Sequence, residues 1–225
     1  EISDDVMKSF GDAIRRQDGT MIDRVVAAIR QWSSLQHLSI SGHLEALLLS
    51  ETIRHAPALQ NISLTCGTQM SDDGMKSFSD AIRHAPALHN ISLNGGEMSD
   101  DGMKSFSDAI RHAPALQNIS LDCQGISGDR IRHAPALQNI SLNCGEISDD
   151  GMQSFSEVIR HALASQNISL QCFEMSDDVM KSFSDAIRHA PALHNISLNC
   201  PQMSDDVIKS FSDAIRHAPA LQNIR

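Results

Sequence analysis

Residues 193–220 read LHNISLNCPQMSDDVIKSFSDAIRHAPA, and closely similar text recurs along the 225-residue chain. Successive copies of the opening string are 24, 29, 28, 21, 28, 28 and 28 residues apart, and they begin at Leu35, Leu59, Leu88, Leu116, Leu137, Ser165, Leu193 and Leu221. Self-similarity at a period of this size is typical of solenoids, in which each repeat is one small structural unit. The sequence therefore predicts a stack of similar units rather than a single compact core.

Each unit combines two hydrophobic periods. Ile196 and Leu198 alternate with polar residues, which is the period-2 pattern of a short half-buried strand. After them, apolar residues recur every four positions from Met203 to Ile215, with Ser204 ahead as an N-cap. Acidic residues in the first turn, Arg and His in the last turn and a following Pro then delimit a helix of about 11 to 13 residues.

Such small elements cannot bury their apolar sides alone, so neighbouring units must stack. Equivalent residues then form core columns: Leu59, Leu88, Leu116, Leu137 and Leu193; Ile62, Ile91, Ile119, Ile140, Ile168 and Ile196; and Phe78, Phe106, Phe155, Phe183 and Phe211. The predicted fold class is α/β, with a parallel sheet on one side of a solenoid and helices on the other. One domain spans 1–225: residues 1–34 form divergent N-terminal helical units, and 35–225 form strand–helix repeats with a shortened unit at 116–136.

Two sets of residues carry a family resemblance. The strand spacing of Leu116, Ile119, Leu121 and Ile126 resembles the leucine-rich repeat, and the helical residues Gly102, Phe106, Ile110 and Pro114 resemble its long ribonuclease-inhibitor-like subtype. The resemblance implies a horseshoe of about eight repeats, each about 28 residues long, with strands on the concave face and helices on the convex face. It also implies a protein-binding role, since the family includes protein inhibitors, innate-immune receptors, actin-filament caps and a GTPase-activating protein. In one respect the chain departs from the family: where the family places Asn or Cys, it has Gly67, Gly96, Gln124, Gly145, Phe173 and Pro201, with Cys one place earlier in most units.

Composition excludes several classes of protein. The net charge of -10 argues against nucleic-acid binding, and the chain has no run of about 18 apolar residues and no signal-peptide pattern. The sequence has no phosphate-binding loop, catalytic triad pattern or metal-ligand spacing. We therefore expect no enzyme activity, no cofactor, no metal and no membrane partner.

The five cysteines, Cys66, Cys123, Cys144, Cys172 and Cys200, share one repeat position. In adjacent strands their side chains would point in parallel about 5 Å apart, which favours a ladder of buried reduced thiols over disulfides or a metal site. Six Asn-Ile-Ser sequons would likewise crowd glycans about 5 Å apart on one sheet. Both features predict an intracellular, cytoplasmic protein.

Charged residues repeat at both helix ends. Seven histidines follow Arg at helix C-termini, and five Asp pairs open the helices. These could be a pH-sensing or metal-binding ladder, but the favoured interpretation is that they complement the helix dipoles. The stacked units then have one acidic rim and one comparatively basic rim.

Two surfaces are candidates for partner binding. The concave face predicts a lattice of amide and hydroxyl groups made of Asn61, Ser63, Asn90, Ser92, Asn118, Ser120, Asn139, Ser141, Asn167, Ser169, Asn195 and Ser197. This lattice either binds a partner or stacks its amides along the sheet to remain soluble. On the convex face, the shortened unit lacks seven residues relative to its neighbours, so it predicts a notch near Phe106, Arg130 and Phe155. The alternative is a deletion that the solenoid tolerates without function.

The predicted function is a non-catalytic protein-interaction scaffold or recognition module whose protein partner the sequence does not identify. The alternatives are a GTPase-activating protein that presents Arg130 as a catalytic arginine, and a structural spacer without a specific partner. The chain starts in mid-unit and stops inside a strand, which predicts a fragment of a longer array. Leu221 and Ile224 then have no following repeat to cover them, so end-to-end self-association is also predicted.

Overall fold

The computed structural model describes residues 33–41, 50, 52–65, 72–96, 99–126, 136–161, 164–200 and 203–225. Its strands are β1 (His37–Ser41), β2 (Asn61–Thr65), β3 (Asn90–Asn94), β4 (Asn118–Ile126), β5 (Asn139–Ile147), β6 (Asn167–Glu174), β7 (Asn195–Asn199) and β8 (Asn223–Ile224). Its helices are α4 (Asp72–Ile82), α5 (Asp100–Ile110), α6 (Asp149–His161), α7 (Asp177–Arg188) and α8 (Asp205–His217). The predicted N-terminal helical units at 1–34 lie almost entirely outside the described residues.

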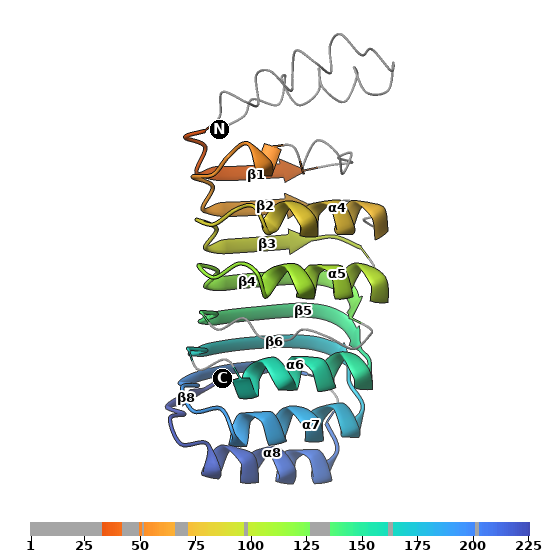
Figure 1. Cartoon of the computed structure of the whole chain (residues 1–225). Helices are drawn as coiled ribbons and strands as arrows, with labels where there is room; N and C mark the ends of the chain where they lie inside the picture. Colours follow the sequence, from red (N-terminus) through yellow and green to blue (C-terminus); the bar gives the residue numbers. More distant parts are fainter. Residues whose placement is uncertain are drawn as a thin grey trace.

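The eight strands form one sheet in the order β1 to β8, and every neighbouring pair is parallel. The register aligns equivalent repeat positions, so Asn118 pairs with Asn139 and Ile119 pairs with Ile140. The helices all lie along one side of this sheet (Figure 1). This topology confirms the predicted α/β fold class, a solenoid with a parallel sheet on one face and helices on the other.

Strand residues alternate between the core and the opposite face. In β5 the side chains of Ile140, Leu142 and Cys144 are buried, and the residues between them are half-buried. The period-2 pattern therefore continues to the Cys position, and this explains why a small apolar side chain stands there. The leading Leu of each unit is also buried, at Leu59, Leu88, Leu116, Leu137 and Leu193.

The helices begin as predicted. In α5, α7 and α8 the residue before the helix is a Ser in extended conformation whose side chain accepts a hydrogen bond from a first-turn backbone N–H. Such a contact satisfies one of the helix's unpaired donors and contributes about 1 kcal/mol. The helices are 11 to 13 residues long, within the predicted range.

A column of phenylalanines fills the space between helices and sheet. Phe78 stacks on Phe106, with ring centroids 6.2 Å apart, and Phe183 stacks on both Phe155 and Phe211 at 6.3 and 6.4 Å. Four of these rings are almost completely buried, and Phe211 in the last helix is partly buried. The predicted Phe column is therefore a core feature.

Helices α5 and α6, which flank the shortened unit, lie farther apart than the other neighbouring helices (Figure 1). The predicted short helix of this unit falls at 127–135, outside the described residues. On the sheet side the structure differs from expectation, because β4, β5 and β6 have nine, nine and eight residues, whereas β2, β3 and β7 have five. Paired strands continue through Ile126 and Ile147, so extra pairing in the sheet accompanies the shortened unit.

Ser165 occupies the position that Leu holds in the neighbouring units. It is 2% exposed, and its Oγ has no hydrogen-bond partner. We expect Ser165→Leu to raise the free energy of unfolding by about 1–3 kcal/mol, since it buries apolar surface and removes an unsatisfied hydroxyl. Urea unfolding followed by circular dichroism measures this, with Leu193→Ser as the reciprocal control that should destabilise the chain. A lower stability of Ser165→Leu than of the unaltered chain would contradict the prediction.

Candidate binding surface

The face of the sheet opposite the helices is hollowed into a groove of about 820 Å³. The third, fourth and fifth residues of successive units line it, from His37, Leu38 and Ser39 at β1 to Asn223 and Arg225 at the last strand. This is the concave face that the resemblance implies. The groove crosses all eight strands, and its lining contains all twelve of the predicted Asn and Ser residues.

The asparagines of the groove form one continuous ladder of amide hydrogen bonds. The Nδ2 of each Asn donates to the Oδ1 of the Asn in the preceding strand, and Asn61 at the end donates to His37 Nδ1 at 2.8 Å. The members are Asn61, Asn90, Asn118, Asn139, Asn167, Asn195 and Asn223. The predicted stacking of amides along the sheet is therefore confirmed.

The serines lie two residues further along each strand. Among the described residues, the hydroxyls of Ser63, Ser92, Ser120, Ser141, Ser169 and Ser197 have no hydrogen bond to another protein group. Each ladder Asn also keeps one N–H that the ladder does not use, because an amide nitrogen has two. The groove therefore presents regularly spaced, uncharged donors and acceptors.

Replacing one amide of the ladder with a carboxylate is expected to lower the stability of the chain markedly. Asn139 donates to Asn118 and accepts from Asn167 at 2.5 Å. Asn139→Asp removes the donor and sets a carboxylate against the Asn118 carbonyl oxygen, so we expect the free energy of unfolding at neutral pH to fall by about 1–3 kcal/mol. Urea unfolding measures this loss. Asn199→Asp, at an exposed position outside the ladder, should change stability by less than about 0.5 kcal/mol, and equal losses in the two variants would contradict the prediction.

One carboxylate interrupts the neutral lattice. Asp122 of β4 accepts hydrogen bonds from Asn94 Nδ2 at 3.2 Å and from Asn143 Nδ2 at 3.1 Å. The equivalent residues in neighbouring strands are amides, so this negative charge lies near the middle of the concave face.

The cysteines lie on the opposite, buried side of the same strands. Cys123, Cys144, Cys172 and Cys200 are buried thiols, and Cys144 is in register with both Cys123 and Cys172. The hydrogen bond with Cys172 and burial raise the pKa of Cys144, while burial raises the pKa of Cys200 to about 11. The predicted ladder of buried thiols is confirmed for these four; Cys66 lies outside the described residues.

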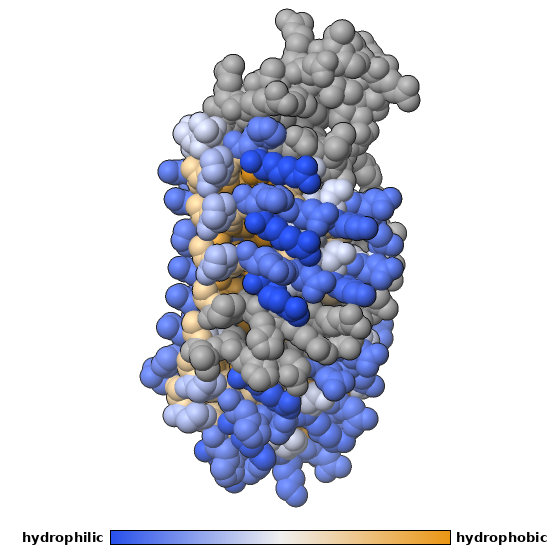
Figure 2. Space-filling model, viewed as in Figure 1, coloured by the Kyte–Doolittle hydropathy of each residue, from blue (hydrophilic) through white to orange (hydrophobic). Residues whose placement is uncertain are grey.

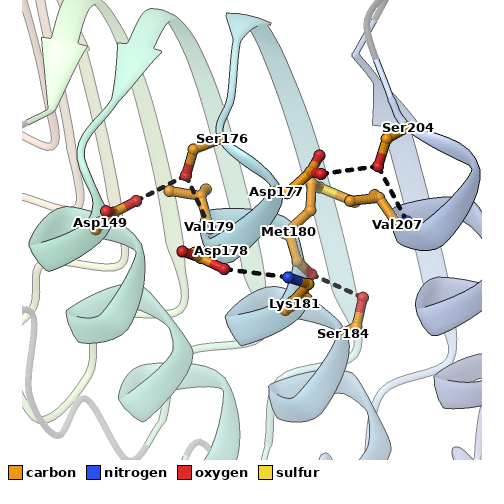
Figure 3. Close-up of polar contacts among 10 residues, drawn as sticks. All are labelled: Asp149, Ser176, Asp177, Asp178, Val179, Met180, Lys181, Ser184, Ser204 and Val207. Atoms are coloured by element: carbon orange, nitrogen blue, oxygen red, sulfur yellow. Dashed lines mark hydrogen bonds and ion pairs between the residues drawn. The ribbon is translucent and has the colours of Figure 1, made fainter.

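The acidic rim contains a relay between successive helices (Figure 3). Ser176 Oγ accepts from the backbone N–H of Val179 at 3.1 Å and donates to Asp149 Oδ1 of the preceding helix at 2.7 Å. Ser204 repeats this geometry, with its hydroxyl donating to Asp177 Oδ2 at 2.9 Å. The first Asp of each pair therefore serves the next helix's cap in addition to its own helix dipole. The second Asp of the α7 pair, Asp178, instead pairs with Lys181 at 3.2 Å.

The opposite rim joins helices through Arg and Asp. Arg160 forms an ion pair with Asp185 of the next helix, and Arg188 does the same with Asp213. The histidines lie where they were predicted: His189 and His217 each donate from Nδ1 to a backbone carbonyl of their own helix at 2.8 Å. Within the described ranges, no group of three or more His, Cys, Asp or Glu is arranged to hold a metal ion.

The convex notch residues take other places. Phe106 and Phe155 are buried at 0% and 2% exposure, so both rings face the core rather than a partner. Arg130 lies outside the described residues. On the side of the molecule that carries the helices, hydrophilic side chains dominate, with a hydrophobic band along the turns from helices to strands (Figure 2). At the C-terminal end, Ile224 is 46% exposed and Leu221 is partly buried.

Two features were missed at the sequence level. Phe173 on β6 is 60% exposed, although it occupies a position that most other units give to Gly or Pro. The departure of Phe173 from the repeat was visible in the sequence, but its exposure was not. Ile208 on α8 is 49% exposed, whereas its equivalent Met180 is buried by the next helix.

A scan against protein-family models and a search of the curated proteins both give no match. Among solved structures, the chain is similar to the leucine-rich repeat-containing protein LegL7 from Legionella pneumophila, with 14% identity, a TM-score of 0.45, and coverage of 90% of this chain and 68% of that one. It is also similar to the tropomodulin C-terminal domain from Caenorhabditis elegans, with 12% identity, a TM-score of 0.37, and coverage of 88% and 92%. Because both TM-scores are below 0.5, the fold assignment rests on strand order and helix placement. None of the described helices is long and apolar enough to cross a membrane.

Proposed function

We propose that the chain is a non-catalytic protein-binding solenoid that takes up an extended segment of a partner protein along its concave groove. The single observation that carries this proposal is the groove of about 820 Å³ that runs without interruption across all eight strands. A surface of this form fits a long, narrow ligand better than a compact one. Concave arrays of stacked repeats characteristically present such extended binding surfaces.

The chemistry of the groove favours a polypeptide. The polar side chains of its lining are amides and hydroxyls, with His37 at one end and Arg225 at the other as exceptions, and Leu38 and six Ile residues also line it. A peptide backbone offers one donor and one acceptor per residue and can pair with both kinds of group. Among the described residues that line the groove there is no Phe, Tyr or Trp, the side chains on which sugars and nucleobases stack.

The repeat lengths and the buried thiols bear on the repeat subtype and on the cellular location of the protein. We infer a ribonuclease-inhibitor-like subtype, supported by helices of 11 to 13 residues in units of about 28 residues. We also infer an intracellular, cytoplasmic location, supported by the four buried thiols, because adjacent reduced cysteines suit a reducing compartment.

Selection of peptides provides the test. A random peptide library displayed on phage is enriched on the full chain, and the affinity of the selected peptides is measured by fluorescence anisotropy. Ser120→Trp places a bulky ring in the middle of the groove and should weaken binding at least about tenfold, or 1.4 kcal/mol. Lys181→Trp, on an exposed helix position, is the matched control. The spacer alternative predicts that no peptide is enriched, and selected peptides that bind Ser120→Trp as tightly as the unaltered chain would place the binding surface elsewhere.

A further inference from the structure

Asp122 is the one acidic residue in its row of the sheet, counted across the described strands β1 to β7. The residues in register with it are all uncharged: Ser41, Thr65, Asn94, Asn143, Gln171 and Asn199. Asp and Asn have nearly the same shape, so the exchange of amide for carboxylate at this position changes charge and leaves size unaltered. The row therefore carries a single negative charge, on the fourth of the eight strands.

This carboxylate faces the side of the sheet that holds the groove. Along β4 the half-buried side chains of Asn118, Ser120 and Asp122 alternate with buried ones. Asn118 and Ser120 line the groove, and strand alternation sets Asp122 on the same side. Its Cα lies about 7 Å beyond that of Ser120, given two residues of strand rise, so Asp122 is at the margin of the groove.

Two neighbouring amides hold the carboxylate in place. Asn94 Nδ2 donates to Oδ2 of Asp122 at 3.2 Å, and Asn143 Nδ2 donates to Oδ1 at 3.1 Å. Each carboxylate oxygen can accept two hydrogen bonds, so each keeps a lone pair for a further donor. These two positions suit the parallel N–H groups of an arginine, which bind a carboxylate in bidentate fashion. Because the amides already fix the Asp122 side chain, a ligand that binds it has less conformational entropy to remove.

No cation among the residues that the structure describes neutralises Asp122. Its carboxylate is hydrogen-bonded by the two amides and forms no ion pair with a described residue. The described Lys and Arg residues lie on helices or in the turns that follow them, apart from Arg225. Arg225 is at the last strand, four strand spacings or about 19 Å away. The negative charge of Asp122 is therefore available to a ligand.

We propose, on the basis of the groove-binding function proposed above, that Asp122 selects partner segments with an arginine or lysine at one fixed position. The basic side chain extends from the groove past Ser120 and forms charge-assisted hydrogen bonds with the carboxylate. The Asn and Ser lattice repeats from strand to strand and offers a segment many equivalent registers, whereas the charge of Asp122 occurs once in its row. This charge therefore determines which residue of the segment lies at β4, since electrostatic complementarity contributes specificity and register more than affinity.

Parallel selections test this role of Asp122 separately from the groove itself. The random peptide library is enriched on the unaltered full chain and on Asp122→Asn, which has the amide of the neighbouring strands. We expect a basic residue at one aligned position of the peptides from the unaltered chain, and no such position in those from Asp122→Asn. Peptides enriched on both proteins without a fixed basic position would overturn the role of Asp122 and leave the groove proposal intact. Enrichment on neither protein would overturn both.

Affinities of two matched peptides measure the contribution of the charge. The probes are the tightest selected peptide and a derivative with glutamine at its basic position, both followed by fluorescence anisotropy. The derivative should bind the unaltered chain at least about tenfold more weakly than the parent peptide, whereas Asp122→Asn should bind the two within about twofold. Asp206→Asn removes an equal charge from an exposed position at the start of α8 and should keep the tenfold preference. If Asp206→Asn loses the preference as well, the peptide responds to overall charge and the proposal is wrong.

Reversal of the charge is the second check. Asp122→Lys should prefer a peptide with glutamate at the basic position over the parent peptide, because the signs of both partners are exchanged. The circular dichroism of Asp122→Lys shows whether the variant is folded. A folded Asp122→Lys that still prefers the basic peptide would assign the cation to another carboxylate and overturn the proposal.

Discussion

Replacing Phe183 with Ala is expected to lower the free energy of unfolding by about 3–5 kcal/mol. The ring is completely buried and stacks between Phe155 and Phe211, with centroid distances of 6.3 and 6.4 Å. The variant therefore loses apolar burial, leaves a cavity between two helices and breaks two aromatic contacts at once. Urea unfolding of the full chain, followed by the far-ultraviolet circular dichroism of the helices, measures the loss.

Phe173→Ala is the control for this experiment, since it makes the same chemical change at a ring that is 60% exposed. It should alter stability by no more than about 0.5 kcal/mol. If the two variants lost similar amounts, the Phe column would not be the core that the packing indicates.

Alkaline pH is expected to destabilise the chain through its buried thiols. Burial raises the pKa of Cys200 from its ordinary value of 9.0 to about 11 in the folded chain. A raised pKa means that the folded state holds the proton more tightly, so the stabilisation is present below pH 9 and is lost as the pH rises through 11. The loss should be on the order of 2 kcal/mol, and Cys144, whose pKa is also raised, adds to it.

Urea unfolding at pH 8 and pH 11, in the presence of a reductant, measures the effect. The chain has no Tyr, so no phenol titrates in this interval. Cys200→Ala is the control: it should be less stable than the unaltered chain at pH 8, because it loses a buried side chain, but its stability should fall less between the two pH values. Parallel losses in the two proteins would show that other groups govern the alkaline transition.

The regular part of the fold could be predicted from the sequence because each unit repeats the same local signals. The same hydrophobic periods recur in several units, so an error in interpreting one unit is corrected by comparison with the others. These periods predict the Leu, Ile and Phe columns, the Ser caps and the helix lengths. Ser176 and Val179 illustrate this, since their capping contact repeats at Ser204 and Val207.

The irregular part could not be predicted in the same way. Strand length at β4, β5 and β6 depends on pairing with neighbouring strands, which a one-dimensional pattern does not contain. The same limit applies to Phe173, because the repeat pattern does not reveal that its side chain is 60% exposed. The sequence placed Phe106 and Phe155 both in the core column and beside the predicted notch. In the structure both side chains are buried in the core.

The sequence predicted which Asn and Ser residues line the groove, but it did not predict the direction of the hydrogen bonds between the Asn side chains. Alternation along each strand was enough to place the Asn and Ser residues on the face away from the helices. The direction of the amide ladder depends on the side-chain rotamers of Asn118, Asn139 and their neighbours, which the sequence does not specify.

The hydrogen bonds of the amide ladder depend on the distance between neighbouring strands and not on the number of residues that join those strands. Neighbouring ladder residues are 29, 28, 21, 28, 28 and 28 positions apart, yet the hydrogen bond across the 21-residue step from Asn118 to Asn139 is the same as the others. Insertions and deletions in the helical half of a unit therefore leave the ladder intact. A lineage that gains or loses helical residues can remodel the outer surface of this protein while the concave surface is inherited unchanged.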